Sequence, residues 1–386
     1  MKINKILLCI LTISIILSGC TQKQDIVPEA SNATAATDNG VIDEKQSNKV
    51  ISILAGEDYS VALLEDGSIF FWGNNKLGIK NPGIEDDIKT PTLIKKIPNV
   101  VKVTGGWSHL LAIDANGDVW GVGSNGSGQL GDGTFESKDT IFKLDKVNSI
   151  IDIDSQGDTV IALKDNGEVW TWGDNMYGQL GTSRENIEMP EGVTGLNDFK
   201  QVVTGGLYSL ALKNDGNVYA WGYFRELNLC TDNFAAEPSK VIGISEIKSI
   251  SGSPSSMLAL KEDGTVWYWG DVDEVQQVEG LNNIVSIAKG DFHNLAIDNQ
   301  GKVWTWGDNE YGELGYGFAE NDYFTPRQIE GLENIIAVSG GDGHSIALDS
   351  NGDVWTWGKN DKGQLGDNTN IDKYEPTKIE IKDNLN

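Results

Sequence analysis

Short apolar runs separated by turn residues recur along the chain with a period of about fifty residues. In the third period, a run from Val160 to Leu163 is followed by Asn166-Gly167 and then by the alternating stretch Val169 to Trp172. An Asn-Gly pair between two runs of strand-forming residues is the strongest local signal for a β-hairpin, and it predicts a type I′ turn. Another β-branched run precedes each hairpin and a fourth run follows it, as at Ile335 to Val338 and Pro376 to Ile381. Each period therefore predicts four short antiparallel strands.

The dipeptide Trp-Gly marks the same point in almost every period. It stands at Trp72-Gly73, Trp172-Gly173, Trp221-Gly222, Trp269-Gly270, Trp306-Gly307 and Trp357-Gly358, with Val122-Gly123 in register. The steps between successive glycines are 50, 50, 49, 48, 37 and 51 residues. Because one four-stranded sheet of this length cannot bury both of its faces, the units must stack on one another. Seven units over residues 50–386 therefore predict an all-β fold, a seven-bladed β-propeller of four-stranded antiparallel blades, with eleven of the twelve tryptophans in the packing layer between blades.

Two further motifs recur in a fixed order in most units. His344-Ser345-Ile346-Ala347-Leu348 shows the first, and Tyr177-Gly178-Gln179-Leu180-Gly181 shows the second. Together with the Trp-Gly element between them, they closely resemble the regulator-of-chromosome-condensation repeat family over residues 50 to about 381. The resemblance implies a propeller that acts as a recognition platform, and guanine-nucleotide exchange on a small GTPase is the activity that gave the family its name. One similar branch, secreted bacterial protein inhibitors of β-lactamases, uses aromatic residues in the loop before the first motif.

Departures from regular repetition predict local features. A proline opens several fourth runs, which suits the first residue of a strand or an edge strand. The second motif is degraded in blades one and four and deleted in blade five, so we expect a notch beside blades four and five, flanked by Tyr223, Phe224 and Arg225. The strand near Thr377 to Ile381 is expected to close the ring by pairing with the first blade.

The N-terminal segment has a different character. Lys2 and Lys5 precede an apolar run from Ile6 to Leu17, which ends in Leu17-Ser18-Gly19-Cys20. A basic start and a run too short to span a bilayer are typical of a secretory signal, and the last four residues look like a bacterial lipobox. We therefore expect residues 1–20 to be a lipoprotein signal peptide and Cys20 to carry the lipid that anchors the protein to the cell membrane on its extracytoplasmic side. An ordinary cleaved signal is the alternative, and residues 21–49, poor in large apolar side chains, are expected to form a flexible tether.

The net charge and the small number of cysteines and histidines argue against several classes of function. The formal net charge is −27, and such a surface repels nucleic acid, so no nucleic-acid partner is expected. Among the cysteines, only Cys230 lies outside the signal segment and the lipobox, and it has no disulfide partner. The three histidines, His109, His293 and His344, occupy one repeat position, so their atoms should lie on a wide ring rather than converge on a metal ion. We expect each to tie a loop to its strand, and we expect neither a metal nor a cofactor.

The short loop before the His-Ser motif differs between units, and its seven copies should ring the central channel on one face. Trp107 is the one tryptophan outside the ladder positions, and Phe292 is equally out of pattern. Aromatic side chains on loops among acidic residues are typical of an interaction site, whereas the alternative for Trp107 is extra packing over the edge of its blade. The candidate binding face comprises Tyr59, Asp58, Trp107, Asp158, Leu207, Tyr208, Asp291, Phe292 and Asp342.

These features favour a non-catalytic recognition protein, a monomeric propeller that engages a protein or glycan partner through its loops and meets the membrane only through its lipid anchor. Two alternatives stay open. A glycan-active enzyme of the cell envelope would need converging carboxylates, for which Asp58, Asp158, Asp291 and Asp342 are the candidates in the ring. Guanine-nucleotide exchange rests on family resemblance alone, and the signal segment argues against it because it places the domain away from small GTPases.

Overall fold

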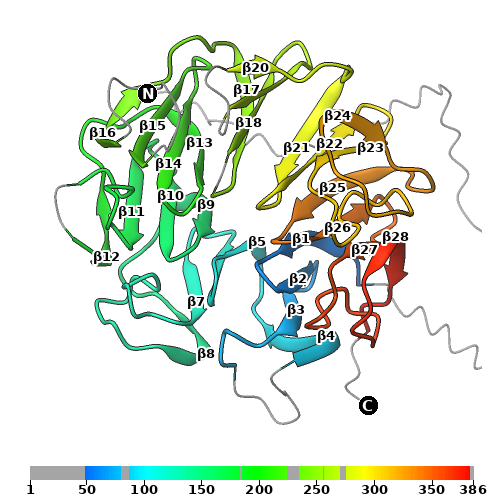
Figure 1. Cartoon of the computed structure of the whole chain (residues 1–386). Helices are drawn as coiled ribbons and strands as arrows, with labels where there is room; N and C mark the ends of the chain where they lie inside the picture. Colours follow the sequence, from blue (N-terminus) through cyan, green and yellow to red (C-terminus); the bar gives the residue numbers. More distant parts are fainter. Residues whose placement is uncertain are drawn as a thin grey trace, which may run out of the picture. The chain divides into compact units, whose positions relative to one another are not determined.

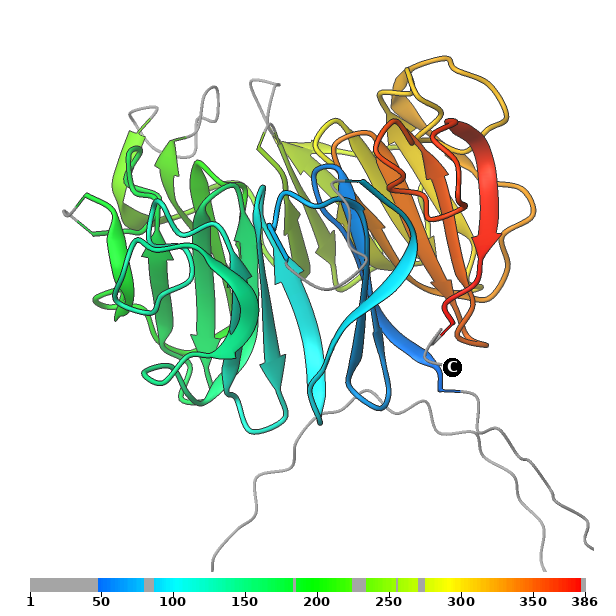
Figure 2. The same cartoon turned by 90° about the horizontal axis from the view of Figure 1, so that it is seen from below.

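The computed structural model describes residues 48–79, 87–182, 185–223, 234–254, 256–269 and 275–382. Within the compact unit Ser47–Asn386, the strands form seven separate four-stranded antiparallel sheets, and no helix occurs among the described residues. The sheets are arranged in a ring about a central axis, which Figure 1 shows along this axis and Figure 2 from the side. Residues of the first strand of each blade line a central channel. The predicted seven-bladed β-propeller is confirmed.

The strands of the seven blades have the following bounds. Blade one contains β1 (Val50–Ala55), β2 (Tyr59–Leu64), β3 (Ser68–Asn74) and β4 (Asp87–Lys96). Blade two contains β5 (Val100–Gly105), β6 (His109–Asp114), β7 (Val119–Gly123) and β8 (Lys138–Lys143). Blade three contains β9 (Ile150–Gln156), β10 (Thr159–Lys164), β11 (Val169–Gly173) and β12 (Ile187–Gly192). Blade four contains β13 (Phe199–Thr204), β14 (Tyr208–Lys213), β15 (Val218–Tyr223) and β16 (Phe234–Lys240).

The remaining three blades follow the same plan. Blade five contains β17 (Ile247–Gly252), β18 (Met257–Lys261), β19 (Val266–Trp269) and β20 (Gln276–Gln277). Blade six contains β21 (Ile284–Lys289), β22 (His293–Asp298), β23 (Val303–Gly307) and β24 (Asp322–Gln328). Blade seven contains β25 (Ile335–Gly340), β26 (His344–Asp349), β27 (Val354–Gly358) and β28 (Lys373–Ile379).

The ring closes without exchange of a strand between blades, so the expected pairing of the C-terminal strand with the first blade is wrong. β28 pairs with β27 of its own blade, and blade one consists of β1 to β4 in chain order. Side chains and single backbone hydrogen bonds make the closure instead, and one backbone bond runs from Asn368 N to the Lys89 carbonyl at 2.9 Å. His344 Nε2 lies 3.0 Å from Ser60 Oγ, Trp72 Nε1 donates to the Gln364 carbonyl at 2.9 Å, and Ala55 N donates to Ser339 Oγ at 3.0 Å.

The hairpin turns are not of the expected type I′. In blade one, Gly67 has a φ of 82°, whereas Asp66 keeps a negative φ, and Gly67 N donates to the Leu64 carbonyl at 2.9 Å. This is a three-residue loop, a type I turn followed by a left-handed glycine. The side chain of Asp66 explains the difference, because its Oδ1 accepts a hydrogen bond from Ser68 N at 3.0 Å and so stabilises the turn.

The prolines of the fourth strands lie inside these strands, not at their starts. Pro91 is the fifth residue of β4, and Pro326 is the fifth of β24. Each falls within a register shift: Phe71 and Gly73 of β3 pair with Thr92 and Ile88 of β4, so extra residues bulge out of the fourth strand there. A proline is tolerated at such a bulge because no ladder hydrogen bond is lost, and the expectation of an edge strand holds.

The second motif of one blade covers the inner tryptophan of the next blade. In blade three, the Trp172 indole is fully buried, and its Nε1 donates to the Gln129 carbonyl of the blade-two loop at 2.9 Å. The same bond joins Trp357 to the Glu313 carbonyl at 2.8 Å. Blade five has no second motif, and for the Trp306 indole N–H in blade six no partner exists among the described residues.

The histidines are structural, as expected, but they join one blade to the next and not a loop to its own strand. His109 Nε2 lies 2.7 Å from Ser155 Oγ in the following blade, and His293 Nε2 lies 2.8 Å from Ser345 Oγ. Because Ser155 Oγ already donates to the Thr159 carbonyl, the imidazole Nε2–H is the donor in this pair. The side chain at the histidine position thus makes one of the polar contacts between neighbouring blades.

The covering loop should contribute measurably to stability. Trp172→Phe removes the indole donor and leaves the buried Gln129 carbonyl unpaired, whereas Trp306→Phe breaks no such bond. We expect the first variant to lose about 1–2 kcal/mol more of its free energy of unfolding than the second. Urea denaturation of both variants measures the difference, and equal losses would show that the loop carbonyl adds nothing.

Candidate functional site

One face of the propeller carries two sets of loops, and we refer to it as the loop face. The loops between first and second strands surround the channel, and backbone hydrogen bonds join them to the loops between third and fourth strands. Examples run from Asn74 N to the Asp58 carbonyl and from Asp174 N to the Asp158 carbonyl, both at 2.9 Å. Exposed aromatic side chains gather on or beside these loops: Trp107, Phe135, Phe292, Phe318, Tyr323 and Phe324. The hairpin turns lie on the opposite face.

Two of these aromatic residues are linked across the mouth of the channel. Trp107 is 46% exposed, and its ring lies over Gly157 of the next blade, whose carbonyl accepts from Trp107 N at 3.1 Å. The neighbouring Gln156 donates from Nε2 to Asp291 Oδ1 in blade six at 3.1 Å. Asp291 directly precedes Phe292, which is 57% exposed. We name Trp107, Gln156, Asp291 and Phe292 the mouth patch.

Trp107 thus combines the two roles that its sequence position left open. One part of the ring packs on Gly157, where an added Cβ would lie 3.8 Å from Trp107 Cζ2. The rest of the side chain faces solvent. An aromatic ring that is fixed on one side and open on the other needs little further ordering when a ligand binds to it.

Tyr59 and Tyr208 lie in the core, so their assignment to the binding face is wrong. Their exposed fractions are 0% and 3%. The Tyr59 hydroxyl donates to the Gly106 carbonyl at 2.9 Å, and the Tyr208 hydroxyl donates to the Ser253 carbonyl at 2.7 Å. They occupy the histidine position of the repeat and also bind the next blade, but through a backbone carbonyl and not through a serine hydroxyl. Leu207, beside Tyr208, is half-buried.

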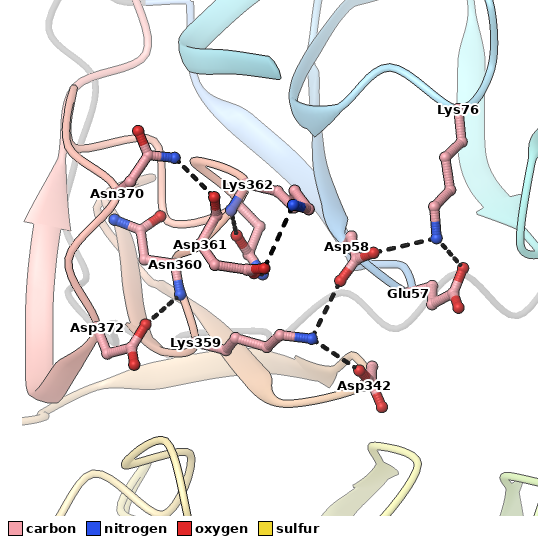
Figure 3. A network of polar contacts seen from close by, with 11 residues as sticks. Glu57, Asp58, Lys76, Asp342, Lys359, Asn360, Asp361, Lys362, Asn370 and Asp372 are labelled. Carbon is pink, nitrogen blue, oxygen red and sulfur yellow. Dashed lines mark hydrogen bonds and ion pairs between the residues drawn. The ribbon is translucent and has the colours of Figure 1, made fainter. Parts of the chain in front are cut away.

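Asp58 and Asp342 belong to an ion-pair network at the seam between blades seven and one. Figure 3 shows the Asp58 carboxylate between two lysine side chains. Lys76 Nζ lies 3.0 Å from Asp58 and 2.7 Å from Glu57, and Lys359 Nζ lies 3.4 Å from Asp58 and 3.1 Å from Asp342. Burial acts to raise the pKa of Asp58, but the two lysines outweigh it and lower that pKa. These carboxylates therefore help to close the ring.

The other two ring carboxyls also have partners within the fold. Asp158 accepts from Gln129 Nε2 at 2.8 Å, while burial and then repulsion by Asp174 raise the pKa of its carboxyl. For Asp291, burial together with the charges of Asp342 and Glu57 raises the pKa to about 6. The four acids are thus engaged in ion pairs and hydrogen bonds that hold loops together.

The histidines are uncharged at neutral pH. Burial lowers the pKa of His109 and His293 to about 3 and that of His344 to about 4. In the described part of the chain, no three His, Cys, Asp or Glu side chains are placed to hold a metal ion.

A hollow of about 650 Å³ lies between blades five and six, one seam further along than the expected notch beside blades four and five. The reason is that a second motif covers the following blade, so its loss in blade five uncovers blade six. Tyr223 does not flank this hollow, because its ring packs against Tyr177 with centroids 5.3 Å apart. Phe224 and Arg225 lie outside the described residues, as does Cys230.

Gln156 was not predicted as a site residue, although its position carries a signal. Five of the seven units have glycine there, for example Gly56 and Gly341. In those blades the large Tyr or His side chain packs against the glycine, and a Cβ on Gly56 would lie 2.3 Å from the Tyr59 ring. Blade three has the smaller Thr159 instead, which leaves room for the glutamine side chain.

The fold and the loop face define a class of protein, a repeat propeller with exposed aromatic side chains on one face. The family model described as RCC1-like domain matches residues 14–282, and the Regulator of chromosome condensation (RCC1) repeat matches residues 300–348 and 351–385. The chain belongs to the RCC1-like family.

Curated relatives match short stretches of the chain. The Ultraviolet-B receptor UVR8 of Arabidopsis thaliana is 39% identical over 77 residues, 19% of this chain and 17% of that protein. The E3 ubiquitin-protein ligase HERC2 of Homo sapiens is 42% identical over 62 residues, 16% of this chain and 1% of that protein. The matches therefore span far less than two thirds of either relative.

Solved structures share the fold over most of the chain. Human WBSCR16 superposes with a TM-score of 0.73 at 21% identity, covering 81% of this chain and 94% of that one. Yeast RCC1 (Prp20), solved bound to Kap60, gives a TM-score of 0.71 at 21% identity, and the superposition covers 92% of this chain and 91% of that one. At this level of identity the likeness establishes the architecture alone.

The expected signal peptide, Cys20 and the tether up to residue 47 lie outside the described residues. Among the residues that are described, no helix is long and apolar enough to cross a bilayer.

One acidic residue of the loop face should make stability depend on pH. Glu313 stands where Gln179 and Gln364 stand in other blades, and burial raises the pKa of its carboxyl to about 7 from an ordinary value of 4.5. The folded state thus holds this proton more tightly than the unfolded state, so stability is lost as pH rises from about 4.5 to 7. Glu313→Gln should raise the free energy of unfolding by roughly 1–3 kcal/mol at pH 8 and change it little at pH 4.5. Urea denaturation at the two pH values tests this, and an equal effect at both would contradict it.

Proposed function

We propose that this chain is a non-catalytic recognition protein that binds a protein partner through the mouth patch. The observation that carries the proposal is the pair of exposed rings, Trp107 and Phe292, joined by the Gln156–Asp291 hydrogen bond. Aromatic anchors that surround a satisfied polar pair are the usual centre of a protein interface. The partner should present apolar pockets to the two rings and a basic rim to the acidic surface around them.

The relatives support a protein as the ligand. Yeast RCC1 (Prp20) was solved bound to Kap60, and another structure of Prp20p is described together with its binding to Gsp1p and histones. Those partners belong to that protein. What we extend to this chain is the use of an RCC1-like propeller as a protein-binding surface.

We further propose that a lipid on Cys20 holds the propeller at the outer side of a cell membrane. The described chain enters the propeller on the face of the hairpin turns, because the Lys49 carbonyl accepts from Glu65 N in the blade-one turn at 2.9 Å. The first described residues therefore lie on the face opposite the mouth patch.

Capture experiments test the binding surface. The full chain, immobilised, is exposed to envelope and culture-supernatant extracts beside the double variant Trp107→Ala, Phe292→Ala. A partner retained by the wild type should bind the double variant at least about tenfold more weakly, because truncated anchor residues dominate interface energies. Phe135→Ala is the matched control, since Phe135 is 51% exposed on an outer loop of the same face and should bind normally. Equal retention by the double variant would refute the mouth patch.

Metabolic labelling tests the anchor. Cells that express the full chain and are fed an alkyne-tagged palmitate should yield a labelled membrane-associated protein, and Cys20→Ser should abolish both the label and the membrane association. Because the lipobox is expected to be cleaved before the modified cysteine, mass spectrometry should also find Cys20 at the new N-terminus. Retention of Met1 in the mature protein would exclude this processing.

A further inference from the structure

The hollow between blades five and six differs from the seams with an intact second motif because the loop that would fill it is missing. At those seams a second-motif carbonyl accepts from a side chain of the next blade, as Gln129 does from Trp172 at 2.9 Å. Trp306 instead lines a hollow of about 650 Å³, which falls within the usual size range of small-molecule sites.

Two polar side chains, Lys289 and Asn294, occupy the inner wall of this hollow at repeat positions that hold other residue types in the other blades. Lys289 ends the first strand of blade six, where Ala55 and Gly340 end theirs. Asn294 stands where Ser60, Ser209 and Ser345 use their hydroxyls to bind the carbonyl of a second motif.

These two side chains form a connected polar wall. Lys289 Nζ donates to Asn294 Oδ1 at 2.6 Å, and Asn294 Nδ2 donates to the Trp306 carbonyl at 3.2 Å. Lys289 and Asn294 are 8% and 5% exposed, so the pair is buried at the base of the hollow. The place of the missing loop is thus lined with hydrogen-bonding groups.

Aromatic rings form the other walls. Phe292, Tyr323 and Phe324 are 57%, 54% and 79% exposed, and the rings of the last two lie 6.4 Å apart. Tyr268 lies on the blade-five side, with Lys289 Nζ 5.6 Å from its ring centre. Exposed rings grouped around a polar base give flat apolar surfaces beside hydrogen-bonding groups.

Side chains of both charge signs line the hollow, so neither an anion nor a cation meets only complementary charge there. An anion would face the carboxylates of Glu279 and Asp308, and a cation would face the buried ammonium of Lys289. Bringing a like charge toward either group into a partly desolvated site is costly. The wall offers both donors and acceptors, including the amides of Gln276 and Gln277, and so suits a ligand whose groups do both.

A sugar ring has these properties, since its hydroxyls donate and accept while its C–H face is flat and apolar. We propose that the hollow between blades five and six binds a neutral oligosaccharide, with sugar rings stacked on Tyr323 and Phe324 and hydroxyls bound by Asn294 and the wall around it. This site goes beyond the protein-binding role of the mouth patch.

Binding of defined oligosaccharides tests the proposal. The full chain is screened by saturation-transfer NMR against neutral gluco-, galacto-, manno- and N-acetylglucosamine oligomers of two to four residues, and positives are measured by calorimetry. At least one series should bind, and Tyr323→Ala with Phe324→Ala should weaken it by about tenfold, since both rings are exposed and their loss leaves the core intact. Asn294→Ser, which restores the residue found at Ser60, should also weaken binding severalfold.

Two control variants distinguish sugar binding in this hollow from sugar binding elsewhere on the loop face. Phe135→Ala removes an exposed ring of the same face far along the ring of blades and should bind sugar normally. Trp107→Ala should also bind sugar normally, so failure of protein capture and failure of sugar binding can be told apart. The proposal would be overturned if no neutral oligomer bound at a concentration of roughly 10 mM. A dissociation constant of that size corresponds to a binding free energy of about −2.7 kcal/mol. Undiminished binding by the Tyr323, Phe324 variant, or preference for uronic-acid or amino-sugar oligomers, would overturn it as well.

Discussion

The contact of each blade with the next, made by side chains and by single backbone hydrogen bonds instead of a shared strand, is the constraint on which the rest of the structure depends. No strand is shared between sheets, so the ring exists only because the inner tryptophans, the second-motif carbonyls and the histidine-position side chains meet across the seams. A blade by itself would leave these groups exposed or unpaired, which is why such repeats are stable only in an array. The seam between blades seven and one shows the same contacts, with the Asp58 ion-pair network added on the loop face.

Much of the fold could be predicted because it repeats. The Trp-Gly register fixed the blade number, and the shared histidine position correctly indicated a structural role for His109, His293 and His344. What could not be predicted depends on side chains that compete locally with the backbone. Asp66 stabilises a type I turn through its own carboxylate, and Pro91 lies in a bulge that no alternation of residues reveals.

The candidate site was harder to predict for a different reason. Its key hydrogen bond joins Gln156 to Asp291, two residues that are 135 positions apart and meet across the channel. This contact does not recur in the other repeats, so the repeat pattern could not predict it. Tyr59 and Tyr208 looked like surface aromatics because they stand next to a loop, yet the backbone turns them into the seam. The missing loop of blade five was visible in the sequence, but the direction in which a loop covers its neighbour follows only from the handedness of the ring.

Closure without a shared strand has a consequence for the order of the chain. Since every sheet is made of four consecutive strands, the seam between blades seven and one needs no peptide connection to hold a sheet together. The chain could therefore be circularly permuted so that it starts at a different blade. Joining the ends of the propeller and opening another connection between blades would separate no paired strands. The propeller is in this sense circular, because a chain that began at another blade would still form each sheet from four consecutive strands.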